Sequence, residues 1–217
     1  MPQAEERSGT RTDVVADQIR QGIVLGHYPP DTRLRLDTLA AELGVSRVPL
    51  REAFRELVAE GLVAMYPHRG AVVSQLHQQE LEDCFRLLET LEVIAAERAA
   101  QTDHTRIAKE MSTELDRLDA VPDDGDQAER LRAHRAFHFA MFAILGNGTM
   151  HRHVQMLWHT CERYINLATT GRRHEEAREE HHQLVKYCAH GDTAMLSAIA
   201  RVHVQHAKLA ALNRMYT

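Results

Sequence analysis

The histidines are the residues of this sequence with the clearest capacity for chemistry. The 217-residue chain holds 15 of them, and all but His27 and His68 lie after residue 76. His134 and His138 are four residues apart, so on a helix they share one face and lie one turn apart. Two imidazoles at that separation can bind one metal ion, and neutral imidazoles suit Zn²⁺, Ni²⁺ or Cu²⁺. The pair therefore predicts part of a transition-metal site.

Arg47 and Arg51 have a different chemistry, suited to nucleic acid. Arginine supplies 23 of the 26 basic residues, and its planar guanidinium can form paired hydrogen bonds with a phosphate or a guanine edge. The spacing of four puts both side chains on one helix face, and the amides of residues 46–48 lie at the positive end of that helix, where a phosphate binds well. The alternative is an ordinary solvated face whose arginines pair with neighbouring glutamates.

The elements that must position these arginines lie within residues 11–74. Hydrophobic spacing and turn residues predict helix 12–25, strand stub 34–36, helix 37–43, helix 45–60, and strands 62–66 and 71–73. We expect Asp37 to cap the second helix and Gly44 to end it. Two helices joined by a tight corner and followed by a hairpin make a winged helix-turn-helix.

After residue 75 only helical spacing remains. The predicted helices cover about 77–100, 107–118, 131–145, 149–169, 175–190 and 193–214, with Asp192 as the N-cap of the last. Six helices in about 140 residues make an all-α bundle with its own core. The predicted fold is therefore mostly α, with a winged helix at 11–74 and a six-helix bundle at 77–214. Residues 1–10 lack periodicity and are predicted to be a disordered arm.

Composition excludes several classes of protein. No stretch approaches the roughly 18 apolar residues of a membrane helix, and the charged start is unlike a signal peptide, so we expect a cytoplasmic protein without membrane association. Three cysteines without paired spacing argue against a disulfide framework or a cysteine zinc finger. The net charge of -5 argues mildly against nucleic-acid binding, although the arginines of the third helix concentrate positive charge locally.

The motifs of the first domain form a family pattern. They are Tyr28–Leu34 (YPPDTRL), Leu39–Ala53 (LAAELGVSRVPLREA), Glu60–Val63 (EGLV) and Arg69–Val73 (RGAVV). Together they resemble the GntR family of bacterial transcription regulators. That resemblance places a DNA-contacting arginine at Arg35 and the wing at 69–73. The predicted DNA-contacting residues are Arg35, Ser46, Arg47, Val48, Pro49, Arg51, His68, Arg69 and Gly70.

The helical half resembles the FCD ligand-sensing domain of the FadR-like branch, so that the resemblance covers roughly residues 11–210. The residues that carry it are Leu91-Glu92, Ala95-Ala96, Ala99-Ala100, Phe137-His138, Gly146-Asn147, Glu180-His181, Asp192 and His203. Six helices rather than seven place it nearest the VanR-like subgroup. Many FCD domains hold a divalent metal with an Asp-x3-His pair and two later histidines. The resemblance therefore implies a site of His134, His138, His181 and His203 for zinc or nickel.

Three positions depart from the family or leave its pattern open. His134 stands where aspartate is usual, which weakens affinity for Mn²⁺ or Mg²⁺; alternatively, His134 does not bind the metal and three histidines remain. Leu88 stands where many members carry an arginine for a carboxylate effector, which weakens the case for a simple organic acid. Asn147 either lines the effector pocket or caps the preceding helix.

These observations predict a regulator that binds a short inverted repeat of double-stranded DNA as a homodimer. We expect a repressor controlled by a small metabolite, an organic acid being the family's usual choice, bound over a metal ion. One alternative is a metal-dependent helical enzyme fused to a winged helix, although a di-iron bundle needs two Glu-x-x-His motifs and the chain has only Glu179–His182. Another is a bundle that only dimerises. The other late histidines are expected to be ordinary surface or core residues.

Overall fold

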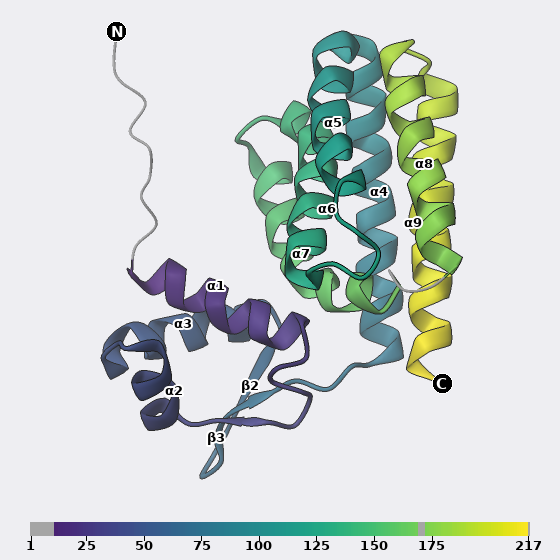
Figure 1. Cartoon of the computed structure of the whole chain (residues 1–217). Helices are drawn as coiled ribbons and strands as arrows, with labels where there is room; N and C mark the ends of the chain where they lie inside the picture. The colour runs from purple at the N-terminus through teal and green to yellow at the C-terminus, as the bar shows by residue number, and fades with distance from the viewer. Residues whose placement is uncertain (1–10, 169–171, 217) are drawn as a thin grey trace, which may run out of the picture. The chain divides into compact units, whose positions relative to one another are not determined.

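The computed structural model describes residues 11–168 and 172–216, and the chain divides into two compact units at Gln75 and Leu76 (Figure 1). The predicted arm at residues 1–10 lies outside the described residues. Among those that are described, no helix combines the length and the apolarity that a membrane crossing requires.

The first unit is a three-helix winged fold. Its elements are α1 (Arg11–Val24), β1 (Arg33–Leu34), α2 (Leu36–Leu43), α3 (Arg47–Ala59), β2 (Val63–Tyr66) and β3 (Gly70–Val73). The strands form an antiparallel sheet in the order β1-β3-β2, with Arg33 opposite Val72 and Tyr66 opposite Gly70. The apolar stripe of α3 supplies Leu50, Ala53 and Leu57, all fully buried, so its opposite face is left to solvent.

The corner between α2 and α3 follows the prediction at one residue and departs from it at another. Gly44 takes the left-handed conformation, φ 64°, that ends a helix and favours glycine. The prediction that Asp37 caps α2 is wrong. The helix begins at Leu36, which packs against the core, so Arg35 occupies the cap position and Asp37 lies in the first turn. The carboxylate of Asp37 forms an ion pair with Arg47 at 2.5 Å instead of capping the helix.

The second unit is an all-α bundle, and the described residues contain the six α-helices that the sequence predicts. They are α4 (Gln78–Thr102), α5 (His104–Asp119), α6 (Gln127–Phe142), α7 (Thr149–Ala168), α8 (Arg172–Ala189) and α9 (Thr193–Met215). A short 3-10 helix, η1 (Ala143–Leu145), follows α6. Asp192 caps α9 as predicted, accepting a hydrogen bond of 3.0 Å from the amide of Met195.

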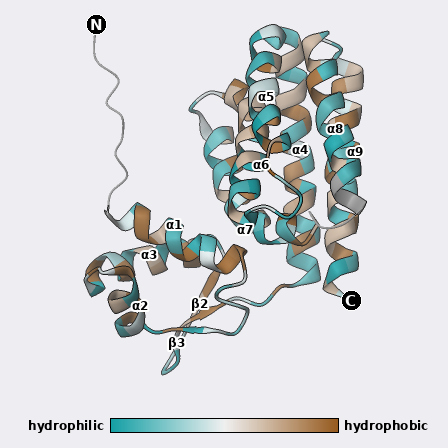
Figure 2. Ribbon diagram, viewed as in Figure 1, coloured by the Kyte–Doolittle hydropathy of each residue, from teal (hydrophilic) through white to brown (hydrophobic). Residues whose placement is uncertain are grey.

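Helix α4 runs through the bundle and packs against α9 and α7. Small residues on its inner face, Ala95, Ala96 and Ala99, are fully buried and let the neighbouring helices approach closely. Each helix of the bundle carries both hydrophobic and hydrophilic residues along its length (Figure 2), as amphipathic helices do. The polar exceptions in this interior are few, and the histidines of α6, α8 and α9 are prominent among them.

Candidate functional site

The bundle brings together the four histidines that the sequence pattern selected. His134 and His138 come from α6, His181 from α8 and His203 from α9, and all four are buried. One ring nitrogen of each lies within 4.8 Å of those of the other three. Ring centroids are 4.6 Å apart for His134 and His138, and 4.7 Å apart for His181 and His203. The spacing of four within α6 supplies one pair, and the packing of α8 and α9 supplies the other.

Two buried carboxylates orient these rings. Nδ1 of His138 lies 2.9 Å from Oε1 of Glu92, and Nδ1 of His203 lies 2.8 Å from Oε2 of Glu180. A carboxylate only accepts hydrogen bonds, so each Nδ1 carries the proton and each Nε2 keeps its lone pair. Burial lowers the pKa of His203, which keeps its ring neutral near pH 7. The tautomers of His138 and His203 are therefore those that a metal ion requires.

Nε2 of His138 fits a metal ion for a second reason. It is buried, and nothing in the described part of the chain forms a hydrogen bond with it. Buried polar atoms normally have a partner, so an unsatisfied one that faces three other imidazoles indicates an absent ligand. Four neutral nitrogen donors match zinc or nickel better than magnesium or manganese.

Sequence reasoning assigned no role to Glu92 or Glu180. Both stood in the family pattern, yet the helices that carry them, α4 and α8, meet their histidines only in the folded bundle. Glu180 also accepts a hydrogen bond of 2.7 Å from Nδ1 of His206, a residue expected to be unremarkable. No spacing in the sequence predicts these contacts, because each partner lies at least 23 residues away.

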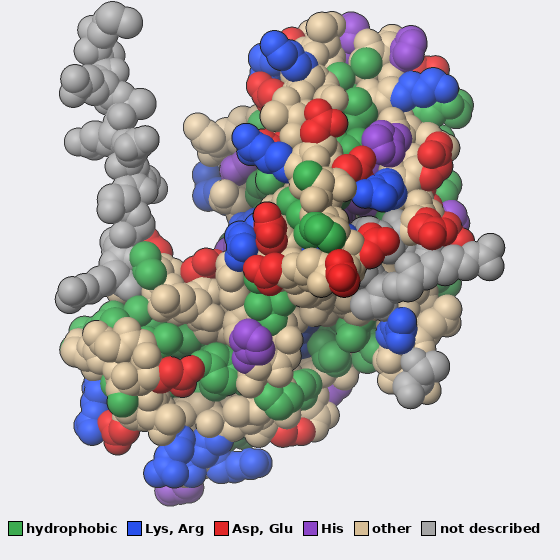
Figure 3. Space-filling model, viewed as in Figure 1, with side chains coloured by type: hydrophobic (Ala, Val, Ile, Leu, Met, Phe, Trp, Pro, Cys, Tyr) green, Lys and Arg blue, Asp and Glu red, His purple; other side chains and the backbone are tan. Residues whose placement is uncertain are grey.

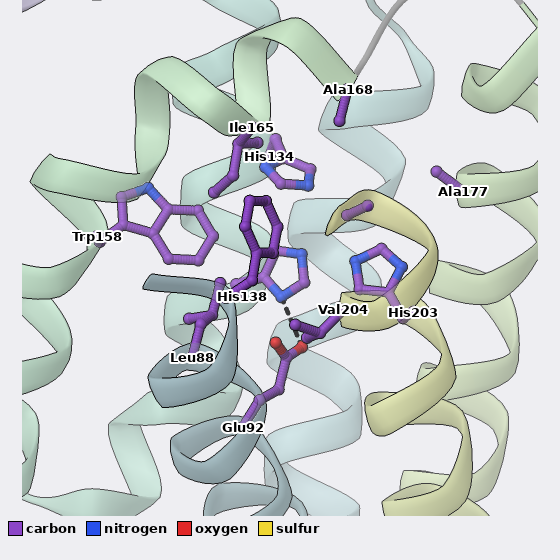
Figure 4. Close-up of a pocket in the computed structure, with 12 residues that line it drawn as sticks. Leu88, Glu92, His134, His138, Trp158, Ile165, Ala168, Ala177, His203 and Val204 are labelled. Carbon is purple, nitrogen blue, oxygen red and sulfur yellow. Dashed lines mark hydrogen bonds and ion pairs between the residues drawn. The ribbon is translucent and has the colours of Figure 1, made fainter. Parts of the chain in front are cut away.

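A small cavity adjoins the cluster (Figure 4). His134, His138 and His203 line it together with Glu92, and its other walls are apolar and include Leu88 and Trp158. Its volume is about 30 Å³, room for an ion and little more. A second small hollow beside His134 and His181 is polar at its edge, where Asp119, Arg130 and Arg178 lie.

The structure also bears on the predictions made for Asn147 and His182. Asn147 is exposed and does not line the cavity, and Gly146 rather than Asn147 ends the 3-10 turn before it. An effector contact through Asn147 therefore has no support from its position. His182 faces away from the cluster and pairs with Asp119 at 2.9 Å, as an ordinary surface residue would.

The first unit presents the predicted recognition face on α3. Ser46, Arg47, Val48 and Arg51 are exposed, and Val48 has 69% of its surface accessible. Pro49 is half-buried in the first turn. The exposed amide end of α3 and the two arginines thus share one surface, as DNA recognition requires.

Ion pairs distinguish the arginines of α3 from one another. Arg47 is paired with Asp37, and Arg55 is paired with Glu52 at 2.7 Å. No ion pair of Arg51 appears among the described residues. The alternative interpretation was that these arginines form an ordinary solvated face and pair with glutamates. It holds for Arg55 and does not hold for Arg51.

The hairpin adds a second basic feature. Arg33, Arg35 and Arg69 line one hollow of about 260 Å³, and basic side chains, all of them arginine in this unit, gather with a histidine at the hairpin tip (Figure 3). At the tip His68 and Gly70 both take left-handed conformations, φ 64° and 75°. Arg33 was not predicted, although the alternation around buried Leu34 puts it on the same side as Arg35.

Comparison with known proteins assigns both units to known domains. A model of the FCD domain matches residues 83–206, more than half of the chain. A model described as bacterial regulatory proteins, gntR family, matches residues 11–73. The chain belongs to the GntR family. This GntR protein is a DNA-binding transcription regulator, and the family resemblance seen in the sequence is confirmed; the VanR-like subgroup stays a prediction.

The relatives of this GntR regulator are transcription regulators and not enzymes. A Paenarthrobacter nicotinovorans protein named "Probable D-xylose utilization operon transcriptional repressor" is 31% identical over 199 residues, covering 90% of this chain and 87% of its own. The transcriptional repressor GlaR of Escherichia coli is 29% identical over 197 residues, covering 86% and 89%. The structure of E. coli McbR/YncC shares the fold, with a TM-score of 0.81 at 22% identity over 95% of this chain and 98% of that one.

Proposed function

We propose that this GntR regulator is a homodimeric repressor whose affinity for DNA is set by a small molecule bound over a metal ion in the helical unit. The names of its relatives support repression, since two of them are transcriptional repressors. The observation that carries the sensing part is the group of four buried imidazoles with nitrogens within 4.8 Å of one another.

In this proposal His138, His181 and His203 hold one divalent ion, zinc or nickel, and His134 is the fourth ligand. The negative charge that an aspartate at position 134 would supply comes instead from Glu92 and Glu180, through their hydrogen bonds to His138 and His203. A bound ion supplies a Lewis-acidic centre for a donor atom of the effector. The chain's own residues orient the imidazoles of His138 and His203, keep His203 neutral and exclude water.

Recognition of DNA is assigned to α3 and the hairpin. Arg51 and Arg47 are placed to contact guanine edges or phosphates, and the exposed amides of residues 46–48 suit a phosphate. Arg47 must leave Asp37 to do so, which costs little because exposed ion pairs contribute at most about 1 kcal/mol. Arg35, His68, Arg69 and Gly70 are assigned to the backbone and minor groove.

A dimer follows from the amount of DNA that one helix can recognise. The exposed start of α3 offers side chains for only a few base pairs, so two-fold symmetry on an inverted repeat is the usual route to specificity. Sedimentation of the purified chain measures its oligomeric state directly. A mass of twice 24.7 kDa is expected, and a monomer that still binds an inverted repeat would contradict the dimer.

The whole proposal is tested with DNA selected from a random duplex pool. The zinc-loaded protein should enrich an inverted repeat. Arg51→Ala should weaken that binding, whereas His203→Ala should keep it but lose zinc and the response to effector. Enrichment of no sequence, or equal DNA binding by Arg51→Ala, would contradict the assignment of α3. Zinc retained in full by His203→Ala would contradict the metal site.

A further inference from the structure

We propose that the effector is an uncharged molecule with an apolar body and a hydroxyl group that donates a hydrogen bond to Glu92, and not a carboxylate. The inference rests on the proposed metal site and names the class of ligand that this site takes. It is drawn from one unsatisfied buried oxygen and from the walls of the cavity beside the histidines.

The unsatisfied atom is Oε2 of Glu92. This side chain is only 1% exposed, and its other oxygen accepts the hydrogen bond from His138 (Figure 4). Oε2 is buried and has no hydrogen-bond partner among the described residues. Leaving a buried carboxylate oxygen without a donor is costly, so a ligand that brings a donor gains affinity at this point.

The rest of the cavity is apolar. Besides the three histidines and Glu92, its lining consists of aromatic, aliphatic and alanine side chains, including Leu88, Trp158 and Val204. None of the described residues that line it is a lysine or an arginine. The cavity therefore offers contact area to a hydrocarbon body and one acceptor to its polar end.

A carboxylate would meet the wrong charge here. Its oxygens would approach the buried Glu92 carboxylate, and repulsion between these like charges offsets part of the attraction that the bound metal ion exerts on an anion. A hydroxyl instead presents a proton to Oε2 and keeps oxygen lone pairs for the metal ion. One functional group thus satisfies both polar features of the cavity.

The alternative binding site for an anionic effector is the second hollow, where Arg130 and Arg178 lie. Both guanidinium groups are already engaged. Arg178 pairs with the carboxylate of Asp119 at 2.7 Å and donates to its carbonyl at 3.0 Å, and Arg130 donates to the carbonyl of Pro122. A carboxylate bound there would have to displace these contacts, whereas a hydroxyl in the first cavity displaces none.

The experiment compares 1-butanol with butyrate on the zinc-loaded full-length chain. The two probes have four carbons each and differ in the polar group, and because the cavity measures about 30 Å³, the lining side chains must move to admit either probe. Trp158 lines the cavity and is the only tryptophan of the sequence, so its fluorescence reports binding. We expect 1-butanol to bind at least about tenfold more tightly than butyrate.

Glu92→Gln removes the negative charge and should reduce that preference to less than about threefold, because the amide donates as well as accepts. Leu88→Arg, one helical turn away, should reverse it in favour of butyrate. Glu97→Gln, at an exposed position of the same helix, is the matched control and should behave as the wild type. If Leu88→Arg fails to fold, the comparison of the two glutamine variants decides the matter.

Equal binding of the probes to the wild-type protein, tighter binding of butyrate, or binding of neither overturns the inference. A preference that survives unchanged in Glu92→Gln does so too. Zinc is measured in the same samples: zinc retained without a preference for the alcohol overturns this inference alone, whereas wild-type protein that retains no zinc overturns the metal site and the inference built on it.

Discussion

Replacing Glu180 by glutamine tests how the carboxylates support the histidine cluster. One oxygen of Glu180 accepts from Nδ1 of His203 at 2.8 Å and the other from Nδ1 of His206 at 2.7 Å. Glutamine is nearly the same size but has one acceptor and one donor. It can satisfy only one of the two rings, and the other must change its tautomer or turn away.

The expected loss follows from the role of the carboxylate behind a metal-binding histidine. Removing such a partner lowers metal affinity about 10- to 100-fold, or about 1.4–2.7 kcal/mol. Adding His206→Ala to Glu180→Gln should restore part of the affinity, because the amide oxygen is then free to accept from His203 alone.

Zinc affinity is measured by competition with a chromophoric chelator at pH 7, with circular dichroism to verify folding. Glu179→Gln is the control. Glu179 accepts a hydrogen bond of 3.0 Å from Gln183, away from the four histidines, so its substitution should leave zinc affinity unchanged. Equal zinc affinities for Glu180→Gln and the wild type would refute the reasoning, as would a double variant that binds zinc less tightly than Glu180→Gln.

Three further predictions concern DNA binding and pH. Arg51→Ala should weaken binding to the selected operator by about 1–3 kcal/mol in a gel-shift titration, whereas Arg55→Ala, whose partner is Glu52, should change it by less than about 0.5 kcal/mol; equal losses would contradict the assignment. Asp37→Asn releases Arg47 from its ion pair and should tighten operator binding by up to about fivefold, and weaker binding would show that the pair helps to orient Arg47. The metal-free protein should lose stability in urea as the pH falls below about 6.5. Burial lowers the pKa of His203, so the unfolded chain takes up a proton that the folded chain does not, at up to about 1.4 kcal/mol per pH unit; a His203→Gln variant with the same pH dependence would contradict this cause.

The periodic parts of the fold were predictable because they depend on local pattern. The apolar stripe of α3, the glycine that ends α2 and the cap of α9 each act within a few residues of their own position. The start of α2 was not predictable from cap preference alone, because the packing of Leu36 against the core moves the cap position from Asp37 to Arg35.

The candidate site shows the same division. The spacing of His134 and His138 follows from helix geometry, and the family pattern selected His181 and His203. The carboxylates of Glu92 and Glu180 belong to other helices, and only the packing of the bundle brings them to the histidines. No sequence pattern predicts the unsatisfied oxygen of Glu92, because it results from the lack of a hydrogen-bond donor beside it among the described residues of the folded bundle.

Metal content is the most direct test of the central claim that the four buried histidines form one binding site. The purified chain is loaded with zinc, dialysed at pH 7 and analysed for zinc per chain. The account predicts one zinc for the wild type, none for His138→Ala, and reduced affinity for His134→Ala. Wild-type protein that retains no zinc or nickel after dialysis would contradict it, and would leave the helical unit as a module that binds its effector by hydrogen bonds or that only dimerises.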